Sequence, residues 1–172
     1  DRALAPLVHR HATVQLALGN ADQAHTLLHE AHRLDRRDLA ITLALGESCF
    51  ARRLWREAAR HLGTLADHPD VPHHGKAVAV GLVHAALAET RSLRPGNAAA
   101  HLEAAVRIDP SCGPAWHALA EAAIERGELE RAAECLEREA AATLAPSDRV
   151  RLYDALGRSE ERRVGKECSL PC

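Results

Sequence analysis

Apolar side chains recur along this chain at the spacing of amphipathic helices. Leu16, the run 43–45 with Phe50, and the run 119–124 place apolar residues three or four positions apart, which puts them on one helix face. β-branched residues are sparse and form no alternating run of strand length. Turn-forming residues interrupt the pattern at Gly19-Asn20, Pro69 with Pro72, Pro95-Gly96-Asn97, Asp109-Pro110, Gly127 and Pro146. The pattern predicts an all-α chain of about eight or nine short antiparallel helices, each ~12 to 16 residues long.

The same small and apolar residues return every 34 residues, in windows 5–38, 39–72, 79–112 and 113–146. The eighth place of the windows holds Ala12, Gly46, Ala86 and Ala120, the twentieth holds Ala24, Ala58, Ala98 and Ala132, and the twenty-fourth holds Leu28, Leu62, Leu102 and Leu136. Small residues let two antiparallel helices cross closely, and the leucine fills the gap between one hairpin and the next. Each hairpin leaves an apolar face uncovered, so neighbours must stack. The alternative, a compact Ala/Leu-rich bundle with coincidental spacing, is disfavoured because four windows agree at three places.

This period resembles the tetratricopeptide repeat (TPR) family. The match is best over 116–132 (WHALA…GELERA) and over 98–110 (A…L…AVRIDP), and it covers residues 5–157, with a partial fifth repeat at 147–157. The resemblance implies an α-solenoid of antiparallel helix hairpins wound into a right-handed superhelix. Two features depart from the family pattern. The aromatic residue usual at the eleventh place is replaced by Gln15, Cys49, Glu89 and Ala123, and six residues, 73–78, are inserted where regular stacking is then less expected.

Residues 158–168, RSEERRVGKEC, resemble the translation of a common sequencing adapter. Lys166 supports this interpretation, because the chain before this stretch holds a single lysine, Lys76, among many arginines. We therefore interpret 158–172 as an artefactual tail, with a genuine charged helix end as the alternative. The chain begins with Asp1 rather than Met, and we expect it to be a fragment of a larger bacterial protein.

Composition narrows the classes of partner. The chain has 172 residues, with 22 Lys and Arg against 24 Asp and Glu, a formal net charge of −2. Near-neutral charge gives no reason to expect a nucleic acid or an acidic membrane, and 2% aromatic residues leave few platforms for base stacking. No apolar run approaches the ~18 residues of a membrane span. We expect no nucleic-acid partner, no membrane partner and a cytoplasmic location.

Cysteine and histidine could carry chemistry. Cys168 and Cys172 lie in the tail, and the remaining Cys49, Cys112 and Cys135 are far apart without a CxxC pair, which favours free structural thiols in a reducing compartment. Among twelve histidines, His25, His29 and His32 stand at i, i+4 and i+7, so two or three could share a helix face. HxxxH without a nearby Glu or Cys is a weak metal motif, and solvent-exposed histidines are the favoured interpretation.

We therefore predict no metal site, no cofactor and no catalytic residue. No Ser/His/Asp order, glycine-rich phosphate loop or close carboxylate pair stands in a suitable context, so the chain is not expected to be an enzyme.

The family resemblance also implies where a partner binds. In TPR arrays the first helix of each repeat lines a concave surface, and the matching positions here are His9, Thr13, Leu43, Glu47, Phe50, Val83, Leu87, His117, Glu121 and Ile124. This apolar, acidic and imidazole surface lacks the paired Lys/Asn clamp with which some family members hold a C-terminal carboxylate. A helix or an extended peptide with apolar anchors is the expected ligand.

The sequence thus predicts a protein-interaction scaffold. One alternative is a substrate-channel or regulatory segment of a larger enzyme or of a secretion or polysaccharide-export protein. A second alternative is a His-rich metal-binding helical protein. We also expect self-association through the last hairpin, whose apolar residues are Leu136, Leu144, Val150 and Leu156.

Overall fold

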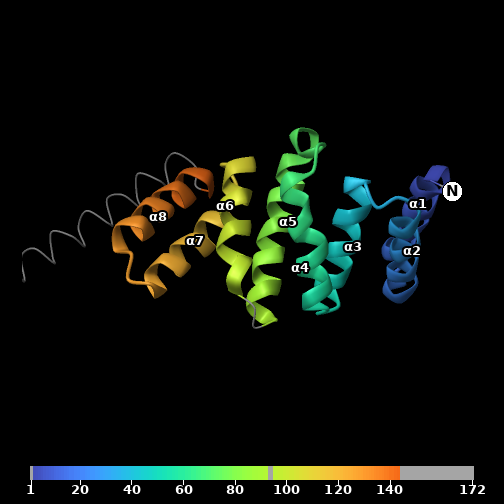
Figure 1. Ribbon diagram of the computed structural model, residues 1–172, viewed down its shortest axis with the longest axis horizontal. Coiled ribbons are helices and arrows are strands. Elements are labelled where there is room, and N and C mark those ends of the chain that lie inside the picture. Colours follow the sequence, from blue (N-terminus) through green and yellow to red (C-terminus); the bar gives the residue numbers. More distant parts are fainter. Residues whose placement is uncertain (1, 93–94, 144–172) are drawn as a thin grey trace, which may run out of the picture.

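The computed structural model describes residues 2–92 and 95–143, which form helical hairpins placed side by side. The hairpins are α1 (Ala5–Ala17) with α2 (Ala21–Leu34), α3 (Leu39–Ala51) with α4 (Trp55–Gly63), α5 (Val71–Arg91) with α6 (Ala98–Ile108), and α7 (Gly113–Glu125) with α8 (Leu129–Thr143). Short 3-10 turns span Arg2–Leu4, Thr64–Asp67 and Pro95–Asn97. Figure 1 shows the hairpins following one another in a row, so the predicted all-α solenoid is confirmed. The partial repeat 147–157 and the tail 158–172 lie outside the described residues.

Small residues at the predicted repeat places form the core between paired helices. Ala12, Ala86 and Ala120 are buried at the eighth place, and Gly46 replaces them in the second repeat because a Cβ there would lie 2.6 Å from Leu62 Cγ and still closer to Cδ2. Leu62 also reaches the next hairpin, since a Cβ on Gly81 of α5 would lie 3.5 Å from its Cδ2. This leucine therefore packs within its own hairpin and against the following one.

Burial at the other two places follows the same rule with two exceptions. Ala24, Ala58, Ala132, Leu28, Leu62 and Leu102 are buried. Ala98 is half-buried, and Leu136 on the last described helix is 41% exposed. Leu136 was one of four residues expected to promote self-association, and the other three, Leu144, Val150 and Leu156, lie outside the described residues.

In the first, second and last hairpins, the turn has the same backbone conformation at the fifteenth place of the repeat. Gly19 and Gly127 have φ of 81° and 75°, and Arg53 takes the same place with φ of 59°. The residue that follows each of them donates its backbone N–H to the carbonyl five residues earlier, at 2.9 Å in all three turns. This is the Schellman closure of a helix, which favours glycine because a Cβ is strained at positive φ. The sequence indicated two of these turns, and Arg53 adopts the third without glycine.

The insertion at 73–78 extends a helix instead of forming a loop. α5 has 21 residues and begins at Val71, with a non-helical residue at His74 (φ −129°, ψ 18°). The lengths of α5, of α4 with 9 residues and of α6 with 11 residues fall outside the predicted range of helix lengths. α5 still packs against both α4 and α6, so the stack continues past the insertion.

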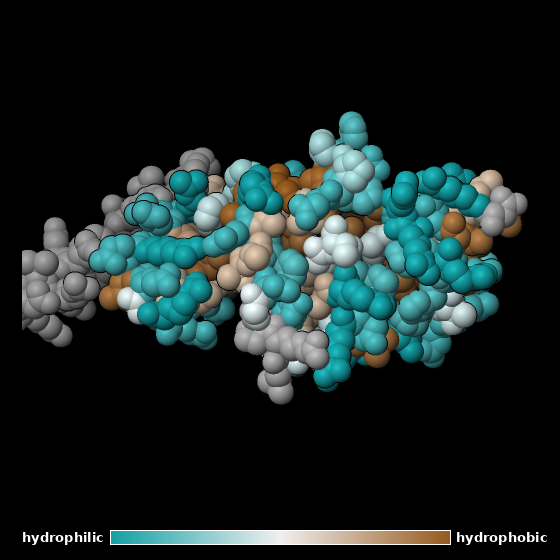
Figure 2. Space-filling view, viewed as in Figure 1, coloured by the Kyte–Doolittle hydropathy of each residue, from teal (hydrophilic) through white to brown (hydrophobic). Residues whose placement is uncertain are grey.

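The visible face of the molecule is mostly hydrophilic, with hydrophobic residues showing in smaller patches (Figure 2). Within 2–92 and 95–143, no helix combines the length and the apolarity that crossing a bilayer requires.

Candidate functional site

The ten residues expected to meet a partner all lie on the first helices of the hairpins, and we call them the first-helix face. They are His9 and Thr13 on α1, Leu43, Glu47 and Phe50 on α3, Val83 and Leu87 on α5, and His117, Glu121 and Ile124 on α7. Of these helices, α3 packs against α5, and α5 packs against α7. Leu87 and Ile124 are 42% and 53% exposed, so apolar surface is available on neighbouring helices.

An aromatic and charged cluster occupies the middle of this face. The Nδ1 atom of His84, on α5, lies 2.8 Å from both carboxylate oxygens of Glu47 on α3. The His84 ring stacks on Phe50, with centroids 4.4 Å apart and planes at 16°, and Phe50 meets Trp55 edge-on at 5.5 Å. The cluster joins two repeats through one imidazole. The sequence did not indicate His84, because it stands at the sixth place, where no repeat periodicity points to a partner.

The α7 end of the face carries a second imidazole between carboxylates. Nε2 of His117 lies 3.5 Å from Glu121 on the same helix, and its Nδ1 lies 3.2 Å from Glu139 on α8. His117 and Glu121 are exposed, so this pair lies at the surface. The repeat positions thus bring acid and imidazole together at two points along the face.

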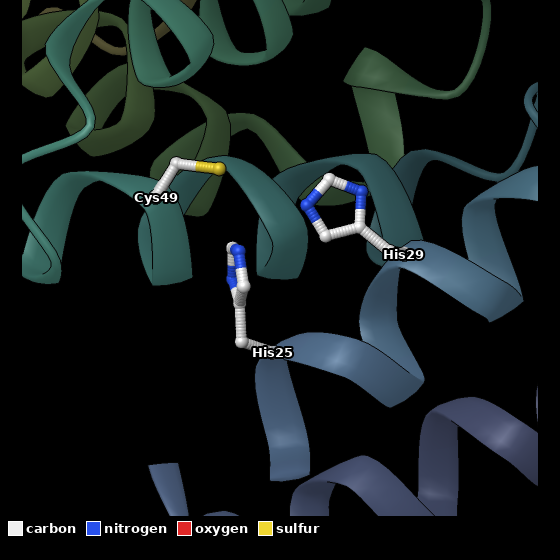
Figure 3. Close-up of side chains that lie close together, drawn as sticks. All are labelled: His25, His29 and Cys49. Carbon is white, nitrogen blue, oxygen red and sulfur yellow. The ribbon is translucent and has the colours of Figure 1, made fainter. Parts of the chain in front are cut away.

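The histidines of α2 do not stay together as a group of three. His25 and His29 have ring centroids 4.6 Å apart, whereas His32 turns to His61 of α4, with centroids 5.0 Å apart. Cys49 of α3 completes the first pair, since one ligand atom from each of His25, His29 and Cys49 lies within 4.8 Å of the others (Figure 3). The sequence showed no cysteine near this motif because Cys49 is 20 residues beyond His29.

Burial favours the neutral forms of the Cys49 thiol and the His25 imidazole. It raises the pKa of the Cys49 thiol to about 11, with Glu57 adding to the effect. Burial also lowers the pKa of His25, and His29 and Arg52 lower it further. The Nδ1 atom of His25 lies 2.9 Å from Ser48 Oγ, which orients the ring toward α3.

The remaining thiols of the described part are also free and buried. Cys112 and Cys135 make no disulfide, and burial raises the pKa of each. A buried thiol with a raised pKa is a poor nucleophile, so the three cysteines behave as small core residues.

Comparison with known proteins shows what part of this chain resembles a repeat family and which solved structures share its fold. A family model described as tetratricopeptide repeat matches residues 92–155. The crystal structure of MamA aligns with a TM-score of 0.68 at 15% identity, over 80% of this chain and 77% of that chain. MamA 41-end from Desulfovibrio magneticus RS-1 gives a TM-score of 0.62 at 14% identity, over 80% and 75%. No curated protein matches the chain significantly.

Identities this low establish likeness of fold alone, so the similarity to the repeat family rests on the matched segment and the repeat pattern. The predicted resemblance to tetratricopeptide repeats is thereby confirmed over residues 92–155, and the described residues fold as the predicted α-solenoid of helix hairpins.

Proposed function

We propose that this protein is an interaction scaffold that binds a peptide segment of a partner protein across α3, α5 and α7. The observation that supports this proposal is the apolar surface on these first helices, which pack against one another. Leu87 and Ile124 are exposed, and Phe50 and Val83 are half-buried beside them. A preformed surface of this kind orders a bound segment at little conformational cost to itself.

The spacing of the helices constrains the ligand. Packed helices lie about 8–10 Å apart, so anchors that contact neighbouring first helices must be separated by about that distance. An extended peptide covers it in about three residues, and a helical peptide covers it in about seven. Glu47 and Glu121 add carboxylates to the face, which favours a ligand that carries basic side chains between its apolar anchors.

The test is a peptide-display selection on the full chain, followed by affinity measurements with the selected peptides. Leu87→Glu should weaken binding about tenfold or more, because it places a charge in the apolar contact and its exposed position does not endanger folding. Phe50→Ala combined with Leu87→Ala should also lose binding. Leu129→Ala is the matched control, since Leu129 is 62% exposed and lies on a second helix. Peptides that bind all variants equally would refute binding at the first-helix face.

We also place the protein in the reducing cytoplasm, because free buried thiols suit that compartment. This location is tested by lysing cells that express the protein under denaturing conditions in the presence of a thiol-labelling reagent. Cysteines recovered in oxidised form would contradict it.

A second candidate function is binding of a divalent metal such as zinc, and the juxtaposition of His25, His29 and Cys49 is the observation that favours it. Zinc bonds nitrogen at about 2.0–2.1 Å and sulfur at about 2.3 Å, so side-chain rotations on α2 and α3 would need to draw the three atoms somewhat closer. A bound ion would link the first hairpin to the second. Because the thiol is protonated at neutral pH, binding would release about one proton.

Calorimetric titration with zinc, in buffers of different ionisation enthalpy, measures both heat and proton release. His25→Ala should abolish the heat, and His32→Ala should leave it unchanged because His32 faces His61. Heat that persists in His25→Ala, or no heat in the unaltered chain, would exclude this site.

A further inference from the structure

A pocket of about 1320 Å³ opens between the second helices of the first two hairpins. Its wall is built from the end of α2, the turn that leads to α3, the end of α4 and the Thr64–Asp67 turn with the residues after it, and Arg2 and Thr42 complete it. None of the ten residues of the first-helix face lines it. The pocket is therefore separate from the proposed peptide surface.

Positive side chains dominate this wall. Five arginines line the pocket, against the two carboxylates of Glu30 and Asp70, and four histidines stand among them. Arg2 is paired with Asp35 at 2.6 Å. Four arginines have no ion-pair partner among the residues that the structure describes: Arg33, Arg36, Arg37 and Arg60. A chain with a net charge of −2 thus concentrates uncompensated cations in one concavity.

Helix dipoles account for only part of this arrangement. Arg33 and Arg60 lie in the last turns of α2 and α4, where a cation is stabilised by the carbonyl end of a helix. Arg36 and Arg37 lie beyond the end of α2, in the turn, and still line the same pocket. Four cations that converge on one space repel one another and are stabilised together when an anion enters.

Burial and these arginines lower the pKa values of two histidines in the pocket wall. Burial and the nearby Arg60, His32 and His29 lower the pKa of His61 to about 4. Burial, Arg36, His29 and Arg60 also lower the pKa of His32, with Asp35 acting in the opposite sense. Both rings are neutral at neutral pH and can each offer one N–H to a bound oxygen.

We propose that this pocket binds an oligophosphate group, whether free or carried by a small molecule. Guanidinium groups match phosphate oxygens with paired, charge-assisted hydrogen bonds, and the four arginines without carboxylate partners are available for them. Apart from the histidines no aromatic side chain lines the pocket, so it offers no platform for a base. Leu65 and Pro69 are its apolar residues, which leaves little to anchor a peptide. The volume exceeds that of ordinary ligand pockets, ~300–1,000 Å³, and accommodates several phosphates with their water.

Calorimetric titration of the full chain with inorganic tripolyphosphate, at low salt and neutral pH, tests the proposal. We expect saturable binding that weakens as salt is added. Arg36→Gln and Arg60→Gln should each weaken it about tenfold, the loss expected for a charged hydrogen bond. Arg107→Gln is the matched control, since Arg107 is exposed on α6 and does not line the pocket. An equal loss in Arg107→Gln would show a general charge effect and overturn the site.

Two further ligands test whether the pocket recognises phosphate rather than any anion, and whether it distinguishes a free phosphate chain from one carried by a nucleotide. Citrate, a trianion of carboxylates, should bind at least about tenfold more weakly, because it lacks the phosphate geometry that arginine pairs match. ATP should bind about as well as tripolyphosphate, since the pocket supplies nothing to hold adenine. Citrate as tight as tripolyphosphate, or ATP far tighter, would overturn recognition of the phosphate chain. No binding of tripolyphosphate at low salt would overturn the pocket as an anion site and leave the peptide-binding proposal untouched.

Discussion

Gly46→Ala should destabilise the protein, although alanine is the better helix former. Gly46 lies inside α3, where replacing glycine by alanine ordinarily gains about 1 kcal/mol of helix stability. The first, third and fourth repeats have alanine at this place and bury it. In the second repeat, a Cβ at this place would instead collide with Leu62.

The magnitude follows from the space around Leu62. The added Cβ would lie 2.6 Å from Leu62 Cγ, roughly 1 Å inside the normal carbon contact distance of ~3.5–4.0 Å. Leu62 is completely buried and contacts the next hairpin near Gly81, so it has no open space into which to move. Overpacking of a core costs about 1–3 kcal/mol, and this site belongs at the upper end. After the gain in helix propensity, the net loss should be about 2 kcal/mol.

Urea unfolding followed by circular dichroism measures this difference, and the melting temperature should fall by about 4–8 °C. Gly75→Ala is the control, because its Cβ would have its nearest neighbour, Ile108 Cγ2, at 3.4 Å. The control should be neutral or slightly more stable than the unaltered chain. A Gly46→Ala protein as stable as the control would show that α3 and α4 do not cross as closely as described here, and the packing argument would fail.

Three further predictions concern single positions. Arg53→Gly should stabilise the protein by about 1 kcal/mol in urea unfolding, because Arg53 has a φ of 59° and glycine relieves that strain; a loss of stability would contradict the turn geometry. Leu62→Ala should cost about 2–5 kcal/mol, and Leu136→Ala should cost clearly less, because Leu136 is 41% exposed at the same repeat place; equal costs would refute the burial pattern. Acid should destabilise the fold through His61, whose pKa is lowered from 6.5 to about 4, because the fold favours the neutral ring. The contribution of His61 to the free energy of unfolding, about 3 kcal/mol, should be complete above pH 6.5 and should be lost as the pH falls toward 4. His61→Gln should flatten that part of the pH–stability curve, and an unchanged curve would show that another group is responsible.

Repeat periodicity alone determined the helices, their pairing and most of the core. Ala12, Ala86 and Ala120 are buried as their spacing predicted, because close helix crossing depends on side-chain size at fixed intervals along the chain. Gly19 and Gly127 marked two turns for a similar local reason, since positive φ favours glycine. The length of α5 was not predictable in this way, because Pro72 and the inserted Gly75 are both unfavourable in a helix interior and yet lie in α5, which packs against α6.

Tertiary structure decided which chemical groups meet. His84 reaches Glu47 and stacks on Phe50 only because α5 packs against α3, and no spacing within either helix indicates that contact. Cys49 joins His25 through the packing of α2 on α3. Arg36 and Arg60 line one pocket although Arg36 follows α2 and Arg60 lies in α4. Helix formation and core burial depend on local periodicity, whereas a site assembled across repeats depends on rotation and offset between hairpins, which the sequence does not specify at any single position.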